Sequence, residues 1–99
     1  MKKEDELARR REAERGTKAR ALIDNPLWAE AWAALETRLM AGWQNSKTGE
    51  SDRRELIYHQ LRAAEAVRSE VEQWIVTGEF AKEQLERSND GRYSVLGPK

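Results

Sequence analysis

Cysteine is absent from the 99-residue sequence, which excludes disulfides, zinc fingers, iron–sulfur clusters and thiol catalysis. The absence of cysteine is compatible with a protein of the reducing cytoplasm. Long apolar runs are absent too: the longest uncharged run, residues 39–46, falls far short of the roughly 20 residues that cross a bilayer. Two lysines near the N-terminus are followed by acids and arginines instead of an apolar stretch. We therefore expect neither a signal peptide nor a membrane span.

Histidine is scarce, and the usual motifs of catalysis are missing. His59 is the only histidine, with Glu55 one helical turn before it. A metal site needs three or four converging ligands, so we interpret His59 as a surface residue. The sequence contains no P-loop, dinucleotide fingerprint or nucleophile motif. We expect no catalytic residue, no metal and no cofactor.

Charge is abundant but balanced, with 18 basic and 18 acidic residues. Residues 1–20 hold a local basic excess, eight Lys or Arg against five Asp or Glu. Clustered cations of this kind bind phosphate backbones. The interleaved acids favour a second interpretation, a solvated helix with ion pairs such as Glu6 with Arg10 and Glu14 with Lys18. The candidate phosphate-binding residues are Arg9, Arg10, Arg11, Arg15, Lys18 and Arg20.

The centre of the chain predicts an antiparallel helical hairpin in an all-α fold. Asn25 followed by Pro26 is a helix start, and apolar residues then recur at three- and four-residue steps over residues 26–44. A polar connection, residues 45–51, contains Gly49. Ser51 is expected to cap a second helix over residues 52–77, and Gly78 to end it.

The ends of the chain predict less regular structure. Residues 2–22 favour a charged helix with few apolar residues, interrupted by Gly16. We expect its first fifteen residues to fray or to be ordered only by a partner. A short helix is expected over residues 79–87, ended by residues 88–91. We therefore predict a charged helical arm (1–20), a helical hairpin domain (21–87) and a flexible tail (88–99).

Four tryptophans in so short a chain leave two interpretations open. They are either a compact core, or partly an interface that two helices cannot cover, and dimerisation into a four-helix bundle would satisfy both. The apolar residues that recur along each of the two predicted hairpin helices are the candidate core and interface residues: Trp28, Trp32, Leu35, Leu39, Trp43, Ile57, Leu61, Val67, Val71 and Trp74.

The pattern of residues 21–28 (ALIDNPLW), Ala31-Trp32, Leu35 and Trp43 resembles small all-helical proteins of tailed bacteriophages and prophages. The pattern continues with residues 54–56 and 61–63, Val67, and Ile75 and Gly78. This resemblance implies a phage-encoded protein acting in virion assembly or DNA packaging, located in the host cytoplasm or the virion.

Together, these observations favour a non-enzymatic, self-associating module with phage structural or packaging proteins as partners. One alternative is a nucleic-acid-binding adaptor, such as a small packaging subunit, that uses the basic arm. A second is an inhibitor that docks on a host protein.

Overall fold

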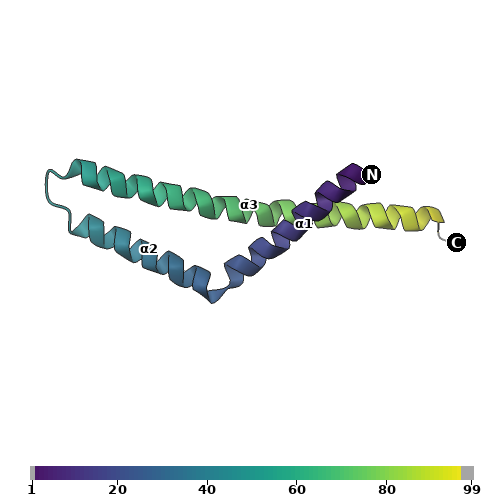
Figure 1. Cartoon of the computed structure of the whole chain (residues 1–99), viewed down its shortest axis with the longest axis horizontal. Coiled ribbons are helices and arrows are strands. Elements are labelled where there is room, and N and C mark those ends of the chain that lie inside the picture. The colour runs from purple at the N-terminus through teal and green to yellow at the C-terminus, as the bar shows by residue number, and fades with distance from the viewer. Residues whose placement is uncertain (1, 97–99) are drawn as a thin grey trace. The chain divides into compact units, whose positions relative to one another are not determined.

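The computed structural model describes the backbone of residues 2–96 and the side chains of residues 2–88. It contains three helices, α1 (Lys3–Asp24), α2 (Pro26–Gln44) and α3 (Ser51–Leu96), shown in Figure 1. The described residues contain no strand. The all-α prediction is confirmed.

Contacts divide the chain into two compact units, to both of which α3 contributes. The first, here the crossing unit, comprises Met1–Ala21 and Val71–Lys99, and the second, here the hairpin unit, comprises Leu22–Glu70. The domain boundaries predicted at residues 20/21 and 87/88 stay a prediction.

In the hairpin unit, α2 and the first part of α3 run antiparallel on either side of the loop at residues 45–50 (Figure 1). The predicted start of α2 is confirmed: Asn25 is extended (φ −71°, ψ 127°), and its side-chain oxygen accepts a 2.9 Å hydrogen bond from the Leu27 N–H. Pro26 occupies the first turn, where a backbone N–H has no partner within the helix, so its absence costs no hydrogen bond. The predicted hairpin is therefore present.

The loop owes its shape to Gly49 and Arg54. Gly49 has φ +97°, a conformation that glycine adopts without steric cost. Arg54 donates from Nε to the Ser46 hydroxyl (2.9 Å) and from Nη2 to the Lys47 carbonyl (2.7 Å). The predicted cap at Ser51 is wrong: Ser51 is already helical, and the carbonyl of Glu50 accepts the bond from the Arg54 N–H.

In the crossing unit, α1 crosses α3 where two glycines meet. A Cβ added to Gly16 would lie 2.7 Å from the Cα of Gly78 and 2.9 Å from the Trp74 carbonyl oxygen. The buried apolar residues around this crossing are Ala13, Ala19, Val71, Ile75 and Ala81. The helix continues through Gly16, so the predicted interruption is wrong. The helix-forming cost of each glycine is offset by the close approach that it permits.

The expected end of α3 at Gly78 is also wrong. Gly78 lacks the positive φ of a helix-ending glycine, and α3 continues to Leu96 without a separate helix at 79–87 or a stop at 88–91. Of the predicted flexible tail, residues 88–96 belong to α3, and residues 97–99 lie outside the described residues.

Candidate interaction surface

The hairpin unit has no buried residue anywhere in residues 22–70, all of which the structure describes. The side chains along its seam, such as Trp32, Leu35, Leu39, Ile57 and Leu61, are only partly covered. Two helices present one stripe to each other and leave the flanks of both stripes open to solvent. The hairpin therefore does not enclose a core of its own.

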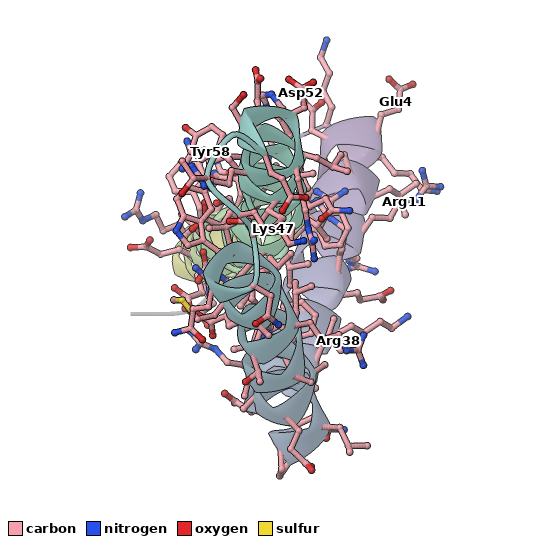
Figure 2. All side chains as sticks on the ribbon, turned by 90° about the vertical axis from the view of Figure 1, so that its left-hand side faces the viewer. Glu4, Arg11, Arg38, Lys47, Asp52 and Tyr58 are labelled. Atoms are coloured by element: carbon pink, nitrogen blue, oxygen red, sulfur yellow. The ribbon has the colours of Figure 1, made fainter. Side chains whose placement is uncertain are left out.

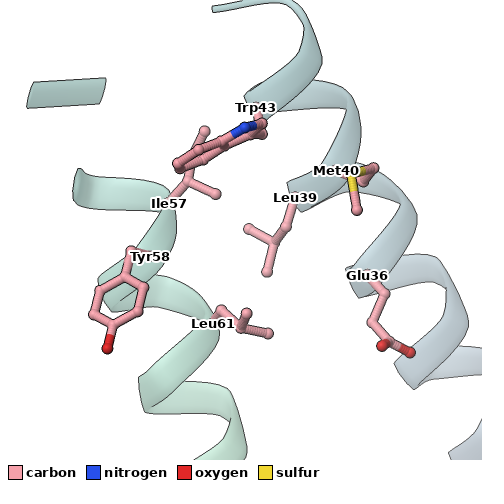
Figure 3. A pocket seen from close by; sticks show the side chains of 7 residues that line it. All are labelled: Glu36, Leu39, Met40, Trp43, Ile57, Tyr58 and Leu61. Carbon is pink, nitrogen blue, oxygen red and sulfur yellow. The ribbon is translucent and has the colours of Figure 1, made fainter. Parts of the chain in front are cut away.

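One flank of the seam is hollowed into an apolar groove of about 290 Å³ near the loop end of the hairpin (Figure 3). We call it the Trp43 groove. In the close-up, Leu39 and Leu61 lie between the two helices, and Glu36 lies at the end away from Trp43. The residues that line the groove are Glu36, Leu39, Met40, Trp43, Ile57, Tyr58 and Leu61.

Helical spacing places the side chains that border the groove. Met40 and Trp43 are three residues apart on α2, and Tyr58 precedes Leu61 by three on α3, so each pair shares one helix face. Met40, Trp43 and Tyr58 stay 58%, 49% and 55% exposed. The Arg54 guanidinium lies 6.0 Å from the centroid of the Trp43 ring, which links the groove to the loop. The groove thus presents large, exposed side chains from both helices.

The opposite flank of the seam has a different chemistry. Its hollow is lined by two arginines and a glutamine together with apolar residues: Leu35, Arg38, Leu39, Gly42, Arg53, Leu56, Ile57 and Gln60. Figure 2 shows Arg38 and Tyr58 projecting to opposite sides of the hairpin. The hairpin therefore has one flank that is almost wholly apolar and one that carries positive charge.

Farther from the loop, two tryptophan rings of α2 and an arginine of α3 pack along the seam. Trp28 and Trp32 have ring centroids 6.3 Å apart and planes tilted by 58°. The Arg68 guanidinium covers the face of Trp32 at 4.3 Å from its centroid. This cation–π contact shields part of the indole that would otherwise face water. Trp28 and Trp32 are accordingly less exposed than Trp43.

The ten residues predicted as core or interface occupy several different places. Leu39, Trp43, Ile57 and Leu61 line the Trp43 groove, whereas Leu35 lies on the opposite flank. Val67 is 62% exposed. Val71 is buried in the crossing unit, where Trp74 lies 5.2 Å beneath the Arg15 guanidinium.

Sequence reasoning missed Glu36, Met40 and Tyr58. The available signal was the spacing of Glu36, Met40 and Trp43, a second row on α2 beside the predicted stripe.

Most of the candidate phosphate-binding cations have partners. Arg9 pairs with Glu12, Arg10 with Glu6, and Arg20 with Glu79, while Arg15 covers Trp74. Two cations remain: Arg11 and Lys18 are exposed and make no ion pair with the residues that the structure describes, and Arg11 points away from α1 in Figure 2. The predicted ion-pair helix is thus present in part, and few cations are left for phosphates.

His59 and Glu55 are both exposed, with Nε2 and Oε1 3.7 Å apart. Among the described residues, no three His, Asp or Glu side chains are grouped to hold a metal ion. None of the helices, as far as they are described, has the length and apolar character needed to span a membrane.

In comparisons with known proteins, no protein-family model, curated protein or solved structure matches the chain significantly.

Proposed function

We propose that this protein is a non-enzymatic, self-associating helical module, in which the hairpin unit completes its core against a second copy. The observation that carries the proposal is the absence of any buried residue between Leu22 and Glu70, together with exposed Met40, Trp43 and Tyr58. Two such hairpins packed together make a four-helix bundle, which covers apolar side chains that one hairpin leaves exposed.

The energetics support association. Burying a large apolar side chain contributes about 1.5–3 kcal/mol, and association costs roughly 4–15 kcal/mol in lost freedom. Met40, Trp43 and Tyr58 are already about half covered, so full burial of all three on both copies would contribute roughly 5–9 kcal/mol, which offsets the lower and middle part of that cost. Charge does not oppose it, since the hairpin unit carries eight acidic and six basic residues.

Size-exclusion chromatography with light scattering tests the proposal. We expect a mass above the 11.5 kDa of one chain, falling toward it on dilution. A single species of 11.5 kDa at high micromolar concentration would contradict self-association.

We further propose a role in phage virion assembly or DNA packaging, with structural or packaging proteins as partners. This part depends on the resemblance of residues 21–78 to small phage-encoded helical proteins. The genes beside this one test it: capsid, portal or terminase genes support the role, and metabolic genes count against it.

Phosphate binding by α1 is a second candidate, which the exposed Arg11 and Lys18 favour. They lie seven residues apart, about two turns, on one face of α1. If each contacts one phosphate, the logarithm of DNA affinity should fall with the logarithm of salt at a slope of about −1.8. Arg11→Glu should weaken binding strongly, and absence of binding at low salt would eliminate the candidate.

A further inference from the structure

The two flanks of the hairpin seam differ enough to identify which of them meets the second copy. We infer that the Trp43 groove packs against the Trp43 groove of a second copy, so that Met40, Trp43 and Tyr58 form the centre of the interface. This inference rests on the proposed self-association and assigns it to one flank. Desolvation, symmetry and exposed area support it.

Desolvation favours the groove. Glu36 is the only charged residue among those that line it, and it lies at the far end from Trp43 (Figure 3). The opposite flank would have to bury Arg38, and Arg53 together with its ion pair to Glu50. Removing a charge from water is costly unless it is paired, whereas apolar side chains gain free energy on burial. The groove is therefore the flank with the smaller desolvation cost when a partner covers it.

Symmetry points the same way. A two-fold interface brings the same patch of both copies together, so every charge on that patch enters the interface twice. On the opposite flank, Arg38 and Arg53 of both copies would bring four positive charges into one interface, and of the two arginines only Arg53 has an acidic partner, Glu50, among the described residues. The groove brings only its two Glu36 carboxylates, each at one end. A second copy therefore fits the groove better than it fits the opposite flank.

The exposed area is of the right size for the centre of an interface. Half-exposed Trp43 and Tyr58 each leave on the order of 100 Å² uncovered, and Met40 adds a similar amount. The sum, roughly 300 Å², equals the lower end of the largest apolar patches on single-chain proteins, which are often functional. Aromatic residues and methionine are enriched at such centres, surrounded by a polar rim. Tyr58 and Trp43 also carry polar atoms that tolerate a partly wet boundary.

Matched substitutions on the two flanks test the inference in the full-length chain. Met40→Glu and Leu56→Glu replace side chains that are 58% and 57% exposed, on opposite flanks, with a residue of similar helix propensity. Tyr58→Lys adds the other sign of charge to the groove. Circular dichroism checks that each variant keeps its helices, and sedimentation velocity over a concentration series gives the dimer dissociation constant.

We expect Met40→Glu and Tyr58→Lys each to raise that constant at least 100-fold, and Leu56→Glu to change it less than threefold. If the parent chain self-associates but Leu56→Glu weakens it as much as Met40→Glu, or more, this inference is overturned while the proposed function stands. If the parent chain is a monomer at every concentration, both are overturned.

Discussion

Gly16 and Gly78 meet backbone to backbone at the crossing of α1 and α3, where a Cβ on Gly78 would lie 2.7 Å from the Cα of Gly16. At this distance neither residue has room for a side chain. The neighbours along both helices at the crossing, Ala13, Ala19 and Ala81, are small as well. The two backbones thus pack closely where α1 crosses α3, beside the buried side chains of Val71 and Ile75.

Gly16→Ala should destabilise the crossing unit. Overpacking costs about 1–3 kcal/mol, and here the new methyl group would meet the Gly78 Cα and the Trp74 carbonyl, neither of which can rotate away. Alanine has a helix propensity up to about 1 kcal/mol more favourable than glycine, which offsets part of this cost. We therefore expect the free energy of unfolding to fall by about 1–2 kcal/mol, measured by urea unfolding followed by circular dichroism.

Gly42→Ala is the matched control for that substitution. Its Cβ would meet only the side chain of Ile57, with Cδ1 at 3.1 Å and Cγ1 at 3.8 Å, and Cδ1 is the end of a flexible side chain. The gain in helix propensity should therefore cancel most of the cost. Equal effects of the two substitutions would show that the Gly16 contact is not tight.

Asn25→Ala should lower the free energy of unfolding by about 1 kcal/mol, because the Leu27 N–H would lose its side-chain acceptor at the start of α2. Asn25→Ser should retain most of the stability, since serine also caps helices. Thermal unfolding at one fixed protein concentration measures both. A loss of similar size in the serine variant would contradict the capping role.

Gly49→Ala should also destabilise the chain, for a different reason. No atom lies within 4 Å of the position that a Cβ would take, so there is no clash, but φ of +97° costs an alanine roughly 1–2 kcal/mol. Gly49→Asn should be milder because asparagine tolerates left-handed conformations better. If alanine and asparagine variants unfold at the same urea concentration as the parent chain, the loop does not need this conformation.

Arg54→Gln should loosen the loop without unfolding the helices. The substitution removes donors to Ser46 and Lys47 and the cation above Trp43, and each lost hydrogen bond is worth about 0.5–1.5 kcal/mol. We expect faster amide hydrogen exchange in residues 45–50. Arg53→Gln is the control, because Arg53 makes only an exposed ion pair with Glu50 at 3.7 Å. Equal exchange in the two variants would refute the role of Arg54.

The hairpin could be predicted because its signals are local. Asn25 and Pro26 mark a helix start by their own chemistry, and the spacing of Trp28, Trp32 and Leu35 indicates a helix whatever surrounds it. The polar loop likewise identified the turn. Each of these signals spans a few residues, so no knowledge of distant contacts was needed.

The crossing could not be predicted, because a glycine can either break a helix or allow two helices to pack closely. By local propensity, Gly16 interrupts a helix and Gly78 ends one. In the structure each supplies the space that the other needs, and this depends on a contact between residues far apart in sequence. The Trp43 groove was missed for a similar reason: Met40 and Tyr58 become neighbours only once the register between α2 and α3 is known.

The most direct test of the account uses the unmodified protein, with isotope-labelled and unlabelled chains mixed at high concentration. Isotope-filtered NMR then detects only contacts between copies. We predict intermolecular contacts from the Met40 methyl group and the Trp43 indole to Tyr58 and Leu61 of the other copy. Their absence, or intermolecular contacts confined to Leu56 and the opposite flank, would contradict the claim that the groove is where two copies meet.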